Sequence, residues 1–322
     1  MPYNLLLNSS NVTNTDNTTY QYNFINGSFN IEEGAEICIS QIVIPYSFFN
    51  LNKGLYNNTN FQFSTFINGT TTNYSLIIPN GFYLTTDINN YLEQYFIANG
   101  LYCTDNSTGN LVFFIYLYTN VTYYANQFIV SPIIPSSTTG YTFPSNYINT
   151  TGVIGYTPKI IFPTTGGLNS ILGFTAGTYP STQSTTTKLN FLSNTTPNAS
   201  PINSIVVRTN LCNNDCASPS DILDTLSLSG ASFGSNITYT PSYEKWINCS
   251  YGTFNTFFVY FQDQNLNRIQ AQDSNVLISL LLRQGTTNRE KELALYQERI
   301  VKSLENPKPN ELVFKDEVPN II

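Results

Sequence analysis

The chain contains no histidine, and this absence removes several kinds of chemistry at once. Without an imidazole there is no Ser-His-Asp or Cys-His nucleophile and no histidine-ligated metal. Carboxylates, thiols and lysines are what remain for catalysis or metal binding. We expect no enzyme activity and no cofactor unless those groups form a site.

Charge is also scarce. Only 10% of the 322 residues are charged, against about 25% in an ordinary soluble domain. The net charge is −7 and no basic stripe is present, which argues against a direct nucleic-acid partner. Asn, Thr, Ser and Tyr take the place of charge, and such a surface is easily buried against neighbouring subunits.

Long apolar runs are missing as well. No stretch approaches the ~18 apolar residues that cross a bilayer, and the first residues lack the basic region of a secretory signal. The cysteines are odd in number and widely spread, which predicts reduced thiols in a cytosolic compartment; they are Cys38, Cys103, Cys212, Cys216 and Cys249.

Two short motifs suggest metal sites, and both are incomplete. Cys212 and Cys216 have the spacing of half a zinc site, but no second close pair accompanies them, so two unrelated thiols are expected. The stretch that begins at Asp263 resembles a calcium loop, but Arg268 replaces the turn glycine and Ser274 the bidentate glutamate. We interpret it as the polar turn of a hairpin.

Two carboxylate pairs are candidates for the acid and base of a glycosidase. One is Asp221 with Asp224, and the other is Glu32 with Glu33. Nothing in the sequence places either pair in one cleft. We therefore expect these side chains to cap helices or to lie in solvated loops.

The body of the chain reads as strands. Segments rich in aromatic and β-branched residues are separated by Asn, Gly and Pro; they include 29–50, 61–67, 72–79, 111–118, 123–130 and 203–211. The segment 254–285 contains two alternating runs around a polar turn and is expected to be a hairpin. Its second run, 275–283, is apolar on both faces, which indicates a position between two layers or at a subunit contact. The pattern predicts an all-β sandwich.

One helix is expected within this body, at about 85–99. Asp87 falls in its first turn and Gly100 supplies a stop. Its apolar residues recur at helical spacing: Ile88, Tyr91, Leu92, Tyr95 and Phe96.

The charged residues gather at the end of the chain. Residues 286–322 hold 6 of the 13 Lys and Arg and 7 of the 20 Asp and Glu. Thr287 and Glu290 form a capping box that opens a helix, and an apolar stripe follows at Leu293, Tyr296, Ile300 and Leu304. Two interpretations stay open for this tail: a helix that docks on a partner through these six residues, and a solvated helix packed on its own domain.

Several phrases, in order along the chain, resemble the penton (minor capsid) proteins of virophages and of Maverick/Polinton virus-like elements. The most specific are IPYSFFN (44–50) and FVYFQDQNLNRI (258–269). The others are YNLLLNSS (3–10), IPNGFYLTTDINNYLEQYF (78–96), NSILGFTAGTYP (169–180), PINSIVVRTNLCNN (201–214), SPSDILDT (218–225) and FGSNITYTP (233–241). The resemblance ends at about residue 283 and does not include the tail.

This resemblance implies a single jelly roll, made from 1–57 and 166–285, with a β-rich domain inserted at 58–165 and the charged tail at 286–322. It implies a homopentamer at the icosahedral vertex of a virion, made in the host cytoplasm and surrounded by trimers of a double-jelly-roll major capsid protein. The tail would contact other minor capsid proteins, and the inserted domain a receptor on a host or giant-virus surface.

Three alternatives share parts of this pattern. A cement-type minor capsid protein would have the same composition without fivefold symmetry. A carbohydrate- or receptor-binding adhesin would use exposed aromatic residues such as Tyr243, Trp246 and Tyr251, although Trp246 is expected in the core. A carboxylate enzyme is the third.

Overall fold

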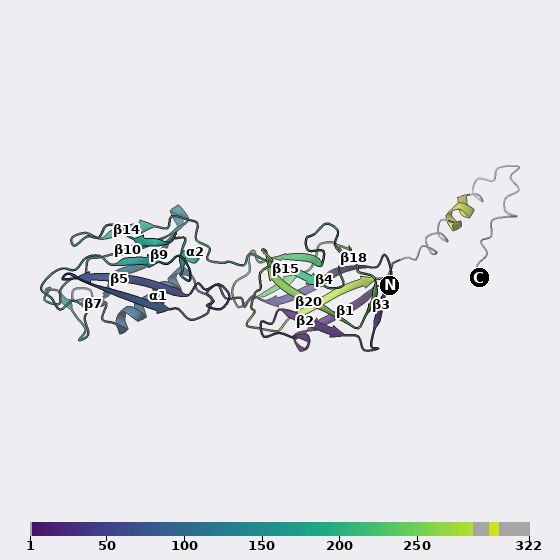
Figure 1. Ribbon diagram of the computed structural model, residues 1–322, viewed down its shortest axis with the longest axis horizontal. Coiled ribbons are helices and arrows are strands. Elements are labelled where there is room, and N and C mark those ends of the chain that lie inside the picture. Colours follow the sequence, from purple (N-terminus) through teal and green to yellow (C-terminus); the bar gives the residue numbers. More distant parts are fainter. Residues whose placement is uncertain (1, 286–295, 303–322) are drawn as a thin grey trace.

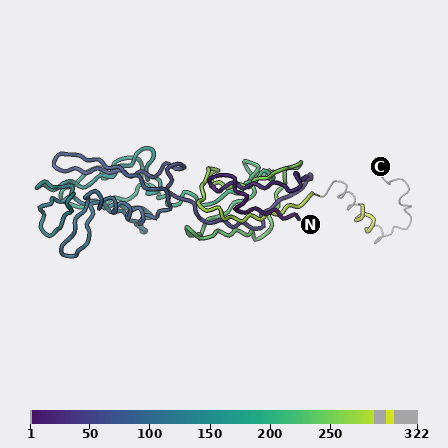
Figure 2. Tube along the Cα trace, turned by 90° about the horizontal axis from the view of Figure 1, so that it is seen from below, coloured from purple at the N-terminus to yellow at the C-terminus, as the bar shows by residue number. Residues whose placement is uncertain are grey.

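A computed structural model of the protein describes residues 2–285 and 296–302. The regular secondary structure is mostly β-strand with few helices, which confirms the all-β class. Figures 1 and 2 show two β-rich units placed end to end along the longest axis. We call residues 2–50 with 200–285 the first unit and residues 51–199 the second unit. None of the described helices is long and apolar enough to span a membrane.

The first unit has two facing sheets. In the sheet that we call the first sheet, the strand order is β1-β21-β4-β17, with β18 also paired to β4. These strands are β1 (Tyr3–Asn8), β21 (Leu277–Arg283), β4 (Glu36–Pro45), β17 (Asn236–Tyr239) and β18 (Ile247–Asn248). All the pairings are antiparallel.

The second sheet lies across the core from the first. Its order is β16-β15-β20-β2, again antiparallel. The strands are β16 (Ile222–Ser227), β15 (Ser204–Thr209), β20 (Thr256–Asp263) and β2 (Thr19–Asn23), and a small ribbon is made by β3 (Phe29–Ile31) and β19 (Gly252–Phe254). Inward side chains of both sheets form one core, as their alternation predicts.

The expected hairpin over 254–285 is wrong. β20 pairs with β15 and β2, whereas β21 pairs with β1 and β4, so residues 264–276 cross from one sheet to the other. The apolar faces of the two strands meet across the core: Phe257, Val259 and Phe261 come from one sheet, and Ile278, Leu280 and Leu282 from the other. The alternation of apolar residues correctly predicted both strands, but it does not identify which strand each of them pairs with.

The second unit enters between β4 and β15. It has a four-stranded sheet of β13 (Gly177–Tyr179), β12 (Lys159–Phe162), β5 (Asn60–Ile67) and β6 (Thr70–Ile77). A three-stranded sheet contains β14 (Leu189–Leu192), β10 (Ala125–Val130) and β9 (Ile115–Asn120), and another contains β11 (Tyr141–Thr142), β7 (Tyr102–Asp105) and β8 (Leu111–Phe113). The helices of this unit are α1 (Thr85–Ala98) and the short α2 (Asn169–Leu172), with a 3-10 turn η2 (Val121–Tyr123). Another 3-10 turn, η1 (Ser9–Asn11), follows β1 in the first unit.

The core of the second unit extends beyond the expected boundaries at 58 and 165. It begins at Leu51 and includes Phe174 and the partly buried Phe191. β13 pairs with β12, and β14 pairs with β10. Residues 166–199, which the sequence assigned to the first unit, therefore pack in the second, because their aromatic side chains complete its core.

Helix α1 is confirmed at the predicted place. Ile88, Leu92 and Phe96 are buried, and the Asp87 carboxylate accepts a hydrogen bond from the Leu84 N–H at 2.9 Å. Gly100 has a φ of +67°, and a Cβ there would lie 2.1 Å from the Asn146 carbonyl oxygen. Only glycine fits both this backbone conformation and this close approach.

Candidate functional site: two outer sheet faces

The outer face of the first sheet, which we call the leucine face, consists of Leu6, Val43, Leu277 and Leu281. Leu277 and Leu281 alternate with the fully buried Ile278, Leu280 and Leu282, as the two-faced apolar pattern predicts. Leu277 and Leu281 are half-buried, and Leu6 on the edge strand β1 is 50% exposed. Polar neighbours on the same face are amides and hydroxyls, such as Ser279, which donates to Asn4 Oδ1 at 3.0 Å.

One charged pair lies at the end of the leucine face. The Arg283 guanidinium contacts Glu36, with Nη2 at 2.5 Å from Oε2, and its Cζ lies 4.2 Å from the centre of the Trp246 ring. Trp246 is half-buried and donates its indole N–H to Glu244 Oε2 at 3.0 Å. One side of its ring is thus covered by Arg283, while Tyr243 and Tyr251 are 67% and 75% exposed.

The outer face of the second sheet has a different chemistry, and we call it the tyrosine face. It consists of Phe258, Tyr260 and Gln262 on β20 together with Arg208 and Asp221. Arg208 donates from Nε at 3.0 Å and from Nη2 at 2.8 Å to Asp221 Oδ1, and from Nη1 at 2.5 Å to Gln262 Oε1. The Tyr260 hydroxyl donates to the same carboxylate. The pKa of Tyr260 is raised to about 12, mainly because the hydroxyl is buried and also because it lies beside the negative Asp221 carboxylate.

Every basic residue of the first unit is neutralised within the chain. The first unit contains four basic residues, which are Arg208, Lys245, Arg268 and Arg283. Their ion-pair partners are Asp221, Asp224, Asp16 and Glu36, respectively. Both outer faces therefore present no unpaired cation, so burying them against another protein surface would leave no basic side chain without a counter-charge.

The carboxylate pairs considered for catalysis do not form a site. Asp221 is held by Arg208, whereas Asp224 accepts from Lys245 Nζ at 3.0 Å and from the Tyr239 hydroxyl at 2.5 Å. This contact with Asp224 raises the pKa of Lys245.

The other two carboxylate motifs have structural surroundings. Glu32 and Glu33 are exposed in the turn before β4. The buried Asp263 accepts from the N–H groups of Asn265 and Asn267 at 2.8 and 2.7 Å, so its carboxylate closes the turn after β20. The calcium-like stretch is thus a turn in which one Asp263 carboxylate oxygen accepts from the backbone and the other from the Asn267 side-chain amide.

The cysteines are all free thiols. Cys212 is buried and Cys216 is exposed, so this pair does not converge. Cys212 instead lies opposite Cys249 in an isolated antiparallel bridge. Burial raises the pKa of both thiols to about 12. No cluster of three or more potential metal ligands occurs among residues 2–285 and 296–302.

The predicted interaction residues of the tail are only partly described. Thr287, Glu290, Leu293 and Leu304 lie outside the described residues. Tyr296 and Ile300 lie in the helical segment 296–302, where Tyr296 is 41% exposed. In the same segment Lys302 contacts Glu298 at 2.6 Å.

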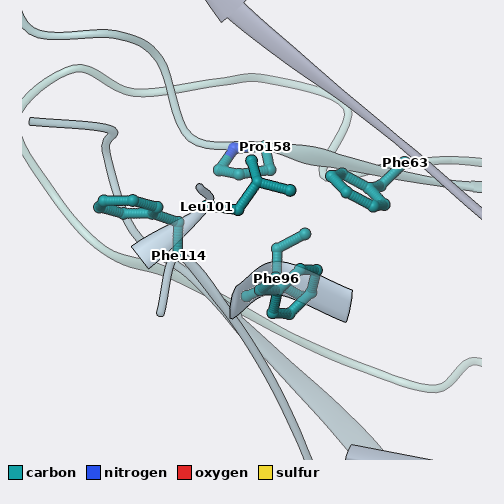
Figure 3. A pocket seen from close by; sticks show the side chains of 6 residues that line it. Phe63, Phe96, Leu101, Phe114 and Pro158 are labelled. Carbon is teal, nitrogen blue, oxygen red and sulfur yellow. The ribbon is translucent and has the colours of Figure 1, made fainter. Parts of the chain in front are cut away.

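The core of the second unit contains a small apolar gap. Figure 3 shows Phe63, Phe96, Leu101, Phe114 and Pro158 around it. Its volume is about 10 Å³. This gap is apolar and no larger than about one water molecule, so it is expected to be dry.

An open groove of about 1020 Å³ lies where the two units meet, and the sequence did not predict it. Phe82 of the second unit stacks on Phe233 of the first, with ring centres 4.7 Å apart and planes 9° apart, and Tyr46 packs on both. The rim carries several serines. Asp87 lies in the wall, and its carboxylate accepts a hydrogen bond from the Leu84 N–H. Tyr46 belongs to the IPYSFFN segment, and this aromatic segment was the one sequence feature that could have pointed to the groove.

Comparisons with known proteins do not identify a family for this chain. No family model matches the chain, and no curated protein sequence matches it. Among solved structures, the chain is similar to the crystal structure of the selenomethionine-labelled mavirus penton protein, with 11% sequence identity and a TM-score of 0.39. The match covers 88% of this chain and 98% of that chain. At this level the likeness carries no argument about function.

Proposed function

We propose that this protein is a structural subunit of a virion that forms a homopentamer and closes the vertices of an icosahedral capsid. The role is mechanical, with no catalytic step and no cofactor. The observation that carries the proposal is the strand order of the first unit, together with its two different outer faces.

The strand order supports a jelly roll. Taking β1, β2, β4, β15, β16, β17, β20 and β21 as strands one to eight, the first sheet has the order 1-8-3-6 and the second 5-4-7-2. Two facing four-stranded sheets linked by crossing connections in this way are what two interleaved Greek keys produce. In this interpretation the second unit is an insertion between the third and fourth strands, and capsid proteins commonly use this architecture.

The two outer faces support a cyclic assembly. In a ring each subunit contacts its neighbours through two different surfaces, so the contact is heterologous. The leucine face and the tyrosine face lie on opposite sides of one sandwich and differ in chemistry. Both are poor in unpaired charge, as expected of obligate interfaces, which bury about 2,000 Å² or more.

The elongated shape supports a vertex position. The second unit lies at one end of the molecule and the chain's N-terminus at the other (Figure 1). With five copies around an axis parallel to this long direction, the second units would project to one side of the shell. The opposite end would meet trimers of a double-jelly-roll major capsid protein, and the tail would meet other minor capsid proteins.

The sequence segments that resemble penton proteins give an independent reason for the proposed capsid role. IPYSFFN forms the aromatic junction between the units, and FVYFQDQNLNRI includes most of β20 and the Asp263 turn. These are positions that hold the sandwich and its insertion together. Their resemblance to virophage and Polinton penton proteins supports a location in the virion, and synthesis in the host cytoplasm is part of the same proposal.

The stoichiometry of the full chain in solution tests the proposal. We expect native mass spectrometry to give a mass of five chains and negative-stain images to show fivefold rings. Density for this chain on the fivefold axis of purified particles is the second measurement. A stable trimer with density between major capsid trimers would favour a cement-type minor protein and overturn the vertex assignment.

A further inference from the structure

A second groove, on the outer surface of the second unit, has the chemistry of a binding site. Its volume is about 680 Å³, and it is bordered by α1 and by the solvent-facing side of the sheet β14-β10-β9. The side chains that matter for recognition are Tyr116 and Tyr118 from β9, Asn89 and Asn90 from α1, and Lys188 and Asn190 from the β14 segment.

One part of the wall is fixed by hydrogen bonds. Asn89 accepts from the Leu117 N–H at 2.9 Å and donates to Glu93 Oε1 at 2.7 Å, which ties α1 to the free edge of β9. The Tyr116 hydroxyl accepts from the Phe113 N–H at 3.0 Å. The groove is therefore formed before any ligand arrives, which lowers the entropic cost of binding.

The other part of the wall is unused by the protein. Tyr118 is 37% exposed, and Asn90, Lys188 and Asn190 are exposed. Within residues 2–285 and 296–302, the side chains of these four residues make no hydrogen bond or ion pair with the protein. One aromatic ring, two amides and one ammonium group are thus available together at the surface.

The charge of the unit narrows the class of ligand. Residues 51–199 contain three lysines, Lys53, Lys159 and Lys188, and three acids, Asp87, Glu93 and Asp105, so the unit is formally neutral. A nucleic acid or a strongly acidic peptide would require a basic surface. A ligand rich in hydroxyls with little charge matches a neutral groove of amides and tyrosine.

We propose that this groove binds a pyranose oligosaccharide. The apolar C–H face of one sugar ring would lie on the ring of Tyr118, which is amphipathic and 37% exposed. Hydroxyls of that sugar and its neighbour would accept from Lys188 and exchange hydrogen bonds with the amides of Asn90 and Asn190. The site is distinct from the aromatic residues Tyr243, Trp246 and Tyr251, which belong to the first unit.

The test uses the full chain on an array of immobilised oligosaccharides that contain mannose, galactose, N-acetylglucosamine or uronic acids. The best binder is then titrated as a free saccharide by calorimetry, up to about 1 mM. We expect binding to a subset of these saccharides and a loss of about tenfold in affinity in Tyr118→Ala. Asn190→Ala is a second variant that removes a hydrogen-bonding group without touching the core.

Tyr123→Ala is the matched control, because Tyr123 is 67% exposed on the same unit but outside the groove. It should bind as the wild type does. Absence of binding to every saccharide overturns the proposal, as does binding that is unchanged in both Tyr118→Ala and Asn190→Ala. Either result leaves the stoichiometry of the ring untouched, so this inference and the proposed function fail separately.

Discussion

Arg208 on β15 holds Asp221 with two of its guanidinium nitrogens, and the shortest contact, from Nη2 to Oδ2, is 2.7 Å. The side chains are 16% and 24% exposed, so the pair is mostly shielded from water. The Arg208 Cζ also lies 4.8 Å from the centre of the Tyr260 ring. This arrangement joins β15 and β20 to the segment before β16 on the tyrosine face.

Asp221→Asn should therefore destabilise the first unit. It leaves Arg208 partly buried without its counter-charge, and a loss of about 1–3 kcal/mol in the free energy of unfolding is expected. Urea unfolding followed by circular dichroism measures the change. Asp215→Asn is the control, because Asp215 is exposed on the same connection, and its effect should stay within about 0.5 kcal/mol. Equal effects of the two substitutions would contradict the role of the pair.

Local patterns in the sequence identified most of the elements but not their partners. Ile88, Leu92 and Phe96 recur at helical spacing, and that alone placed α1. The alternation along β20 and β21 was equally clear, yet pairing across the chain depends on loop closure and core shape. Strands of three or four residues, such as β13 and β14, carry too few alternations to be recognised, which is why the boundary at 166 was misplaced.

The candidate surfaces were predicted to a similar extent. Leu277 and Leu281 stood out as a second apolar face of one strand, and the structure leaves them half-buried. The tyrosine face could not be predicted, and for the junction groove the sequence marked only the segment that contains Tyr46. Arg208, Asp221 and Tyr260, or Phe82 and Phe233, are brought together only by the tertiary fold.

The pH dependence of stability should lie on the alkaline side. Burial raises the pKa of Cys212 and Cys249 from 9.0 to about 12, and that of Cys38 and Cys103 to about 11. The folded chain keeps these protons where the unfolded chain loses them, so the free energy of unfolding falls as the pH rises above 9.0. With no histidine in the chain, it should change little between about pH 6 and pH 8.

Urea midpoints measured under reducing conditions, from neutral pH to about pH 11, test this expectation. Cys216→Ser should reproduce the wild-type curve because Cys216 is exposed. A midpoint that stays constant up to the highest pH would show that the buried thiols do not control alkaline stability.

Deletion of 286–322 should leave a folded ring that enters particles poorly. Among the described residues, neither principal core contains a member beyond Leu282, so we expect both cores to form without the tail. The thermal unfolding temperature and the native mass should match those of the full chain, apart from the missing residues. Incorporation is measured by co-expression with the major capsid protein and the other minor proteins. An unfolded truncated chain would contradict the role of the tail as a docking segment.

Two substitutions that introduce a charge test the two faces of the subunit separately. Leu281→Glu on the leucine face and Phe258→Glu on the tyrosine face each place a carboxylate on a half-buried surface position, so each chain should fold. In an assembled ring that carboxylate would be buried without a partner, at a cost of several kcal/mol by order of magnitude. Each variant alone should be monomeric by native mass spectrometry. Leu111→Glu, at a residue 43% exposed on the second unit, is the control and should still form rings.

A mixture of the two variants is the sharpest form of this prediction. Leu281→Glu retains an intact tyrosine face and Phe258→Glu an intact leucine face, so one contact of the ring can still form between them. Native mass spectrometry of the mixture should give a one-to-one heterodimer and nothing larger. If either variant alone forms a dimer, its remaining face pairs with itself, and the contact is isologous. If both variants still form rings, neither face lies in the interface.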